Sequence, residues 1–183
     1  MKHIKTLGGA IDVFEDCWEY PENTIKLLEG TANDPVRDKV NWESTGYCDA
    51  VNLSRTIRKS ENPIIHKIYE DFRDVLTETI KEYIPRYNIS EDIHSDSPYQ
   101  FLRFKKGQGL PRGYNRNQTI TALLSINGEM EVVFPTQNIW IKFKPNMMII
   151  FPSNFAYQFE SREVTKGNQY AILTFLNDGK VTD

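Results

Sequence analysis

The hydrophobic period of the chain changes at Ser97-Pro98, and this change limits the possible folds more than any other feature. From Ser60 to Pro85, apolar residues recur at steps of three and four, as on one face of a long helix. After Pro98 they alternate in short runs separated by glycine, proline and asparagine. Because an amphipathic helix must bury its apolar stripe, we expect it to pack on a sheet formed by the second half of the chain.

Seven short strands are predicted after Pro98. They are expected at Tyr99–Lys105, Thr119–Asn127, Glu131–Phe134, Ile139–Phe143, Met147–Phe151, Phe155–Glu160 and Gln169–Leu176. Such a series is typical of a sandwich or a barrel-like double sheet with helices on one side. Ahead of the long helix, a strand is expected at Ile11–Phe14 and a short helix at Pro21–Gly30.

Length and composition indicate one globular domain. The 183 residues, 39% of them hydrophobic, suffice for one buried core. We expect a helical and irregular support region over 1–98, a β core over 99–177 and a tail over 178–183. A net charge of −3 argues against a dedicated nucleic-acid binder. No apolar run approaches the roughly 18 residues of a membrane span and no signal core follows Met1, so we expect a cytoplasmic protein without membrane association.

The metal-binding residue types are few and scattered. Cys17 and Cys48 lie far apart without a CxxC pair, and are expected to be small buried side chains. His66 falls within the long helix, where a packed imidazole is expected. The only literal His-x-Asp is His94-Ser95-Asp96, in an acidic polar segment before the first predicted strand of the β half. A solvated loop is expected there, with metal binding by His94 and Asp96 as the alternative.

Three stretches of the second half together resemble the prolyl 4-hydroxylase-like members of the iron and 2-oxoglutarate dioxygenase superfamily. Phe101-Leu-Arg-Phe-Lys-Lys-Gly107 is similar to the strand that leads into the first metal ligands, and Thr119–Asn127 to the strand that follows. Ile141-Lys-Phe-Lys-Pro-Asn-Met-Met-Ile-Ile-Phe-Pro-Ser153 is similar to the Lys-Pro-x-x-Gly turn and the strand ending in Phe-Pro-Ser. The resemblance implies a mainly β, α+β fold: a double-stranded β-helix (jelly-roll, cupin-like) with N-terminal helices packed on one sheet.

The resemblance also implies an iron site, which requires two imidazoles and one carboxylate, and a basic residue that pairs with 2-oxoglutarate. In this sequence the His-x-Asp positions fall at Gly113 and Asn115, the distal histidine at Gln158, and the arginine at Gln169. The chain holds three histidines, none after His94. We therefore expect no catalytic residue, no metal and no cofactor, with iron and 2-oxoglutarate only if the chain is an atypical oxygenase.

A basic segment lies beside these positions. Between Tyr99 and Gln118 the chain has no acidic residue. Its cations are Arg103, Lys105, Lys106, Arg112 and Arg116. This segment is expected to rim the former active site, where it would hold an anion or dock an acidic partner. The alternative is that these residues cover the solvent face of an ordinary strand and loop.

Three functions remain open. The first is a catalytically inactive, dioxygenase-like scaffold that binds a protein partner or itself, with a phage virion component as one form of this role. Outward-facing aromatic residues of the β half would then form the contact, because sheet edges must be covered or paired. The second is an atypical 2-oxoglutarate-dependent oxygenase that uses His94 and Asp96. The third is a metal-free sensor of an anionic metabolite, bound through Lys106, Arg112 or Arg116.

Overall fold

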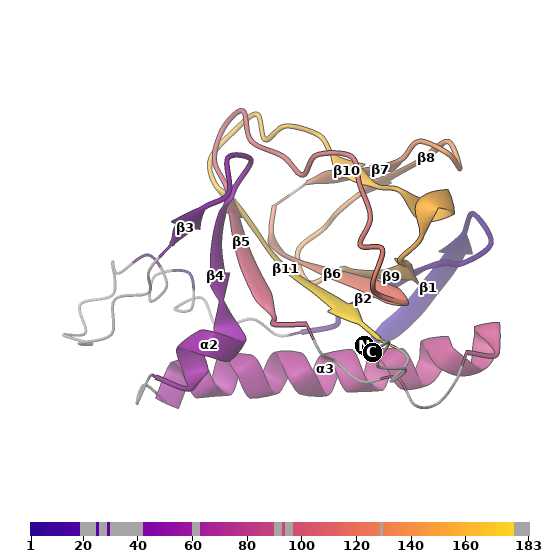
Figure 1. Ribbon diagram of the computed structural model, residues 1–183, viewed down its shortest axis with the longest axis horizontal. Helices are drawn as coiled ribbons and strands as arrows, with labels where there is room; N and C mark the ends of the chain where they lie inside the picture. Colours follow the sequence, from indigo (N-terminus) through magenta and orange to yellow (C-terminus); the bar gives the residue numbers. More distant parts are fainter. Residues whose placement is uncertain are drawn as a thin grey trace.

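The computed structural model describes residues 1–18, 25, 29, 42–59, 63–89, 93, 97–128 and 130–177. Two antiparallel sheets face each other, and a long helix lies across the outer face of the larger sheet (Figure 1). Two facing sheets of this kind form the double-stranded β-helix, so the expected fold class is confirmed. None of the described helices is long and apolar enough to cross a membrane.

The larger sheet has eight strands in the order β1-β2-β9-β6-β11-β5-β4-β3. These are β1 (Lys2–Leu7), β2 (Ile11–Glu15), β3 (Glu43–Ser44), β4 (Asp49–Asn52), β5 (Gln100–Phe104), β6 (Ile120–Asn127), β9 (Met148–Pro152) and β11 (Gln169–Leu176). The smaller sheet has the order β10-β7-β8. Its strands are β7 (Glu131–Phe134), β8 (Ile139–Lys142) and β10 (Glu160–Ser161).

The helix α3 (Pro63–Tyr87) buries its apolar stripe on the larger sheet, as its period predicts. Ile68, Phe72 and Leu76 pack there against side chains of β5, β6 and β11. The short helix α2 (Leu53–Ile57) precedes α3 and lies beside its N-terminal half (Figure 1). Asn52 caps α2, since its side chain accepts a hydrogen bond from the Arg55 N–H at 2.8 Å. The helices therefore cover one face of the larger sheet.

α3 continues past Pro85, where the sequence predicts its end. Proline in the last turn removes only the bond to the carbonyl of Lys81 and leaves the turn in place. The helix ends because Asn88 takes a left-handed backbone conformation, with φ of 49°. The Ile89 N–H then bonds the Ile84 carbonyl at 3.3 Å, which is the Schellman pattern of a helix end.

A buried carboxylate joins this end of α3 to the first hairpin. Asp12, on β2, is fully buried. It accepts hydrogen bonds from the Thr6 hydroxyl at 2.6 Å, the Tyr87 hydroxyl at 2.8 Å and the Arg86 guanidinium at 3.0 Å. A buried charge is tolerated only when it is paired and hydrogen-bonded, and Asp12 meets both conditions. The contact fixes β1 and β2 against the helix layer.

The second core lies between the two sheets. Leu123 of β6, Ile149 of β9 and Ala171 of β11 face Val132 and Ile141 of the smaller sheet, and all five are buried. The central strands of the larger sheet are thus covered on both faces, which explains why seven of the eight residues of β6 are buried. The space that a barrel of this type encloses is largely filled by apolar side chains.

Six of the seven predicted strands of the β half are present within one or two residues of the expected ends. The strand expected at Phe155–Glu160 is wrong in its first part. Phe155–Tyr157 forms a 3-10 turn, η1, because the Asn154 side chain accepts the Ala156 N–H at 3.0 Å, and pairing resumes at Phe159. The strands β1, β3 and β4 were not predicted. The helix expected at Pro21–Gly30 lies outside the described residues, apart from Ile25 and Glu29.

Replacing Phe72 by alanine tests the α3 packing. Phe72 is fully buried between α3 and the larger sheet. Phe72→Ala should lower the free energy of unfolding by about 3–5 kcal/mol, because it leaves a cavity in the core. Urea denaturation followed by circular dichroism measures the change. Arg73→Ala, at an exposed position of the same helix, is the control, and equal unfolding midpoints of the two variants would contradict this packing.

Candidate functional site

Gly113, at the expected position of the first metal-binding histidine, pairs with Phe159 at one end of the space between the sheets. Each residue donates its N–H to the carbonyl of the other at 3.0 Å. The pairing continues through Leu110, whose carbonyl accepts the Ser161 N–H at 3.0 Å. The segment that contains Gly113 therefore extends the smaller sheet beyond β10. Directly opposite residues of an antiparallel pair share one face, so Phe159 is the side chain that faces this site across from Gly113.

Phe159 points into the core between the two sheets and leaves open space at Gly113, where an added Cβ atom would meet no atom of the described residues within 4 Å. Only 6% of Phe159 is exposed. Its ring centroid lies 5.0 Å from that of Phe151 in an edge-to-face contact, and the Phe134 ring contacts Phe151 in the same way at 4.8 Å. Three packed aromatic rings thus occupy the interior next to the expected metal position.

The side-chain oxygens of Asn115 and Gln158 each accept a hydrogen bond from a neighbouring protein group. The Asn115 side-chain oxygen accepts the Asn117 N–H at 3.2 Å and stabilises a local turn. The Gln158 side-chain oxygen accepts a hydrogen bond from the Arg112 guanidinium at 2.9 Å, on the outer face of the pairing that buries Phe159. The structure therefore brings the segments of the predicted site together, but Gln158 does not point toward Gly113.

Gln169, at the expected arginine position, begins β11 and lies on Gly128. A Cβ atom at Gly128 would approach the Gln169 side-chain oxygen to 1.9 Å, so the glycine makes room for this amide. The oxygen is buried, and none of the described residues donates a hydrogen bond to it. Gln169 also borders a hollow of about 630 Å³ at this end of the sheets, together with Met130, Arg162 and Lys166. The glutamine amide is uncharged and lacks the two parallel donors of a guanidinium, so Gln169 does not replace a carboxylate-binding arginine.

The residues at the three metal positions, Gly113, Asn115 and Gln158, do not fit an iron ion. Glycine provides no donor atom, and the amides of Asn115 and Gln158 are bound to neighbouring groups. Among the described residues, no group of three histidine, cysteine, aspartate or glutamate side chains could hold a metal ion. His94 and Asp96 lie outside the described residues, and His66 lies in α3, in the helix layer.

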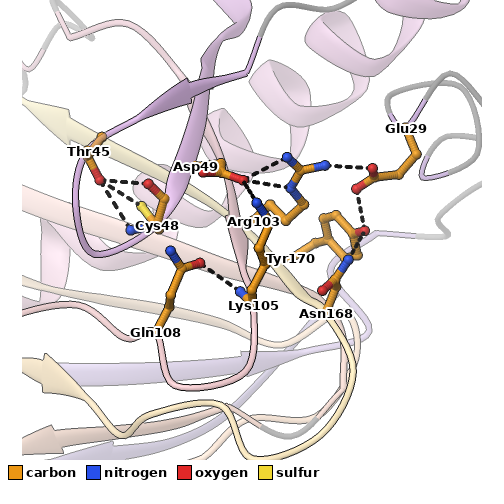
Figure 2. A network of polar contacts seen from close by, with 9 residues as sticks. All are labelled: Glu29, Thr45, Cys48, Asp49, Arg103, Lys105, Gln108, Asn168 and Tyr170. Atoms are coloured by element: carbon orange, nitrogen blue, oxygen red, sulfur yellow. Dashed lines mark hydrogen bonds and ion pairs between the residues drawn. The ribbon is translucent and has the colours of Figure 1, made fainter.

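The predicted basic rim divides into two parts. Arg103 points away from the Gly113 site, toward the helix side of the larger sheet, and its side chain is 13% exposed. Figure 2 shows its guanidinium between two carboxylates, Asp49 at 2.7 Å and Glu29 at 2.6 Å. The guanidinium also lies 4.2 Å from the ring centroid of Trp42, a cation–π contact. Arg103 therefore anchors the preceding segments to the sheet.

Lys105 belongs to the same network. Its ammonium lies 2.8 Å from Asp49. The hydrogen bond from Lys105, followed by that from Arg103, holds the pKa of the Asp49 carboxyl below its ordinary value, although burial acts in the opposite direction. Tyr170 completes the network by donating its hydroxyl to Glu29 at 2.5 Å (Figure 2). The partners of Arg103 lie 54 and 74 positions away in the chain, so the sequence alone did not reveal them.

The second part of the basic rim, Arg112 and Arg116, lies beside Gly113. Arg112 and Arg116 are exposed, and neither pairs with a carboxylate of the described residues. The Arg116 guanidinium lies 6.0 Å from the Tyr114 ring centroid. Phe155, on η1, is 74% exposed, and the hydroxyl of Ser153 ties this stretch to the carbonyl of Asn115 at 2.9 Å. We call Arg112, Tyr114, Arg116 and Phe155 the mouth surface.

Comparisons with known proteins identify the fold. No family model matches the chain, and no curated protein matches its sequence. Among solved structures, a viral collagen prolyl hydroxylase from Paramecium bursaria Chlorella virus 1 is similar with a TM-score of 0.62 and 15% identity over 98% of this chain and 99% of that chain. A second structure of that protein, in complex with 2-oxoglutarate, has a TM-score of 0.59 at 16% identity over 92% of this chain and 96% of that chain.

Two further solved structures are similar to this chain in fold. A prolyl hydroxylase from Trichoplax adhaerens, in complex with a hypoxia-inducible factor peptide fragment, has a TM-score of 0.59 at 14% identity over 94% of this chain and 86% of that chain. An oxidoreductase of the 2-oxoglutarate and Fe(II) oxygenase family from Burkholderia pseudomallei has a TM-score of 0.54 at 9% identity over 93% and 85%. The chain therefore has the prolyl 4-hydroxylase-like, 2-oxoglutarate oxygenase fold, and the predicted resemblance is confirmed at the level of the fold.

These comparisons correct the prediction that the chain uses no cofactor. The similar structures are 2-oxoglutarate and Fe(II) oxygenases, and one of them holds 2-oxoglutarate. The fold thus points to iron and 2-oxoglutarate, even though Gly113, Asn115 and Gln158 do not supply the donor set at the usual place. The prediction relied on residue types at four positions and gave no weight to the chemistry of the fold.

Asp49→Asn should destabilise the protein by about 2–3 kcal/mol at neutral pH, because Lys105 and Arg103 lose a charged hydrogen-bond acceptor. The pKa of Asp49 is lowered by folding, so its contribution is complete above its unfolded value near 3.8 and is lost as the pH falls through the lower folded value. Urea denaturation at neutral pH and at successively lower pH measures this. The stability difference between wild type and variant should shrink on acidification, and a constant difference would contradict the pairing.

Lys67→Ala, which removes an exposed ion pair of α3, is the control and should change stability by less than about 1 kcal/mol.

Proposed function

We propose that this chain acts as a protein-binding module built on the 2-oxoglutarate oxygenase fold, and that its partner docks on the mouth surface. The observation that carries the proposal is the exposure of Phe155. Its side chain is 74% exposed and lies next to the pairing of Gly113 with Phe159. Aromatic side chains and arginines are enriched as anchors in protein–protein interfaces, so an exposed phenylalanine beside two arginines favours a protein partner here. Phe155 is also more exposed than any other large apolar side chain of the described residues.

The charge of the mouth surface indicates an acidic partner. Arg112 and Arg116 flank Tyr114 within five residues, in a chain with a net charge of −3. Arginine and aromatic residues are enriched where proteins bind one another, since they combine a large contact area with directed hydrogen bonds. The similar prolyl hydroxylase from Trichoplax adhaerens is in complex with a peptide fragment, which shows that a protein of this fold receives a polypeptide. An assembly role, including one in a virion, is a special case of this function.

An oxygenase is the second candidate function, and the similar structures favour it. All of those compared are hydroxylases or oxygenases. In this chain an iron site would require ligands other than those at Gly113, Asn115 and Gln158. His94 and Asp96 are the first to consider, and both lie outside the described residues.

The first experiment separates the two functions. The purified protein is titrated anaerobically with Fe(II) and 2-oxoglutarate in a calorimeter, and succinate release is then followed in air. Succinate release above that of the protein-free mixture, lost in His94→Ala, would overturn the binding-module proposal and establish the oxygenase. Succinate at the protein-free level supports the binding module.

The second experiment tests the mouth surface itself. Proteins that copurify with tagged wild type are compared with those recovered by a triple variant, Arg112→Glu, Arg116→Glu and Phe155→Ser. A partner on this surface should be reduced at least roughly tenfold by the triple variant, because charge reversal and loss of the aromatic anchor both act on it. Lys67→Glu with Lys81→Glu, on exposed positions of α3, is the matched control. A partner that the triple variant retains, or that the control variant loses equally, would contradict the assignment.

A further inference from the structure

A second pair of arginines, which form no ion pair with the described residues, lies on the opposite, helix side of the larger sheet. Arg55 and Arg58 are exposed residues at the C-terminal end of α2 and its cap. Both line a hollow of about 320 Å³ between α2, α3 and the stretch that leads into β5. The remaining described lining residues are Asn52, Ser54, Tyr69, Ser97, Pro98 and Tyr99. Residues three apart on a helix project from neighbouring positions, so both guanidinium groups can reach one ligand.

The charge of this hollow is unbalanced. No acidic side chain is among its described lining residues, and neither Arg55 nor Arg58 forms an ion pair within the described residues. Arg73, Arg86 and Arg103 each contact a carboxylate within 3.1 Å. In a chain with more acidic than basic residues, two adjacent arginines that lack a carboxylate are therefore available for an anion from outside.

The rest of the wall is suited to an organic group. The partly exposed ring of Tyr69 borders the hollow, and it packs at 4.9 Å on the buried ring of Tyr99, with the two ring planes tilted by 32°. The Ser54 oxygen accepts the Tyr99 N–H at 3.2 Å, which leaves the hydroxyl proton of Ser54 to donate. A hollow of about 320 Å³ is at the lower end of the range for small organic ligands and is larger than a lone ion needs.

We propose that this hollow binds a small phosphomonoester, with the phosphate held by Arg55 and Arg58 and the organic group against Tyr69. Guanidinium groups bind phosphate through two parallel hydrogen bonds, and the serine hydroxyl adds a third donor. The site is on the helix side of the larger sheet, whereas Phe159 and the mouth surface are on the side of the smaller sheet. It is therefore independent of the proposed protein-binding surface.

Calorimetric titration of the full chain with phenyl phosphate, inorganic phosphate and phenol tests this site. Phenyl phosphate should saturate the protein with one site, and should bind several-fold more tightly than inorganic phosphate because of the contact with Tyr69. Phenol, which lacks the charge, should show no saturation. Arg55→Ala and Arg58→Ala should each weaken phenyl phosphate binding by at least roughly tenfold, since each removes a charged pair of hydrogen bonds.

Arg162→Ala is the matched control, because Arg162 is an exposed arginine beside the smaller sheet and outside the hollow. It should leave the affinity for phenyl phosphate unchanged within about twofold, which is the change expected from one distant surface charge in salt. Circular dichroism checks that all three variants remain folded. Absence of saturation by phenyl phosphate, or equal affinities in wild type, Arg55→Ala and Arg58→Ala, would overturn the proposal.

Discussion

The structure depends on the burial of the central strands of the larger sheet on both faces. β6, β9 and β11 contact the apolar stripe of α3 on one side and the smaller sheet on the other. Phe72 and Tyr83 of the helix and Phe134 of the smaller sheet are fully buried in these two layers. Covering the sheet on both faces removes a large apolar surface from contact with water. These layers therefore supply most of the driving force for folding. The segments that carry functional side chains lie at the ends and on the outer faces of this framework.

The space between the sheets also differs from the usual site of the fold. In the space between the sheets, Phe159 packs against Phe151 and Phe134, directly opposite Gly113. An iron site of the family would require polar ligands in this place. Here apolar packing stabilises the end of the smaller sheet, and the polar residues Asn115 and Gln158 take part in a turn and in a surface hydrogen bond. Fold and site thus carry separate information, as is general for widely used folds.

Arginine residues have three different roles in this structure, and their partners determine which. Arg103 joins Asp49, Glu29 and the ring of Trp42, and so attaches the N-terminal half to β5. Arg112 and Arg116 pair with no carboxylate in the described part of the chain, and they lie at the mouth surface beside the exposed Phe155. The pair on α2 faces a hollow with a tyrosine wall. Only those arginines without a carboxylate partner are available to bind molecules from outside.

The sequence by itself determined the order of helix and strands and the residue types at the family's functional positions. Hydrophobic period is a local property, so α3 and six strands of the β half could be predicted within one or two residues. Only the tertiary structure decided that Phe159 faces Gly113, that Arg103 turns away from the site, and that β1, β3 and β4 join the larger sheet. Each of these facts depends on contacts between residues far apart in the chain, which no local pattern specifies.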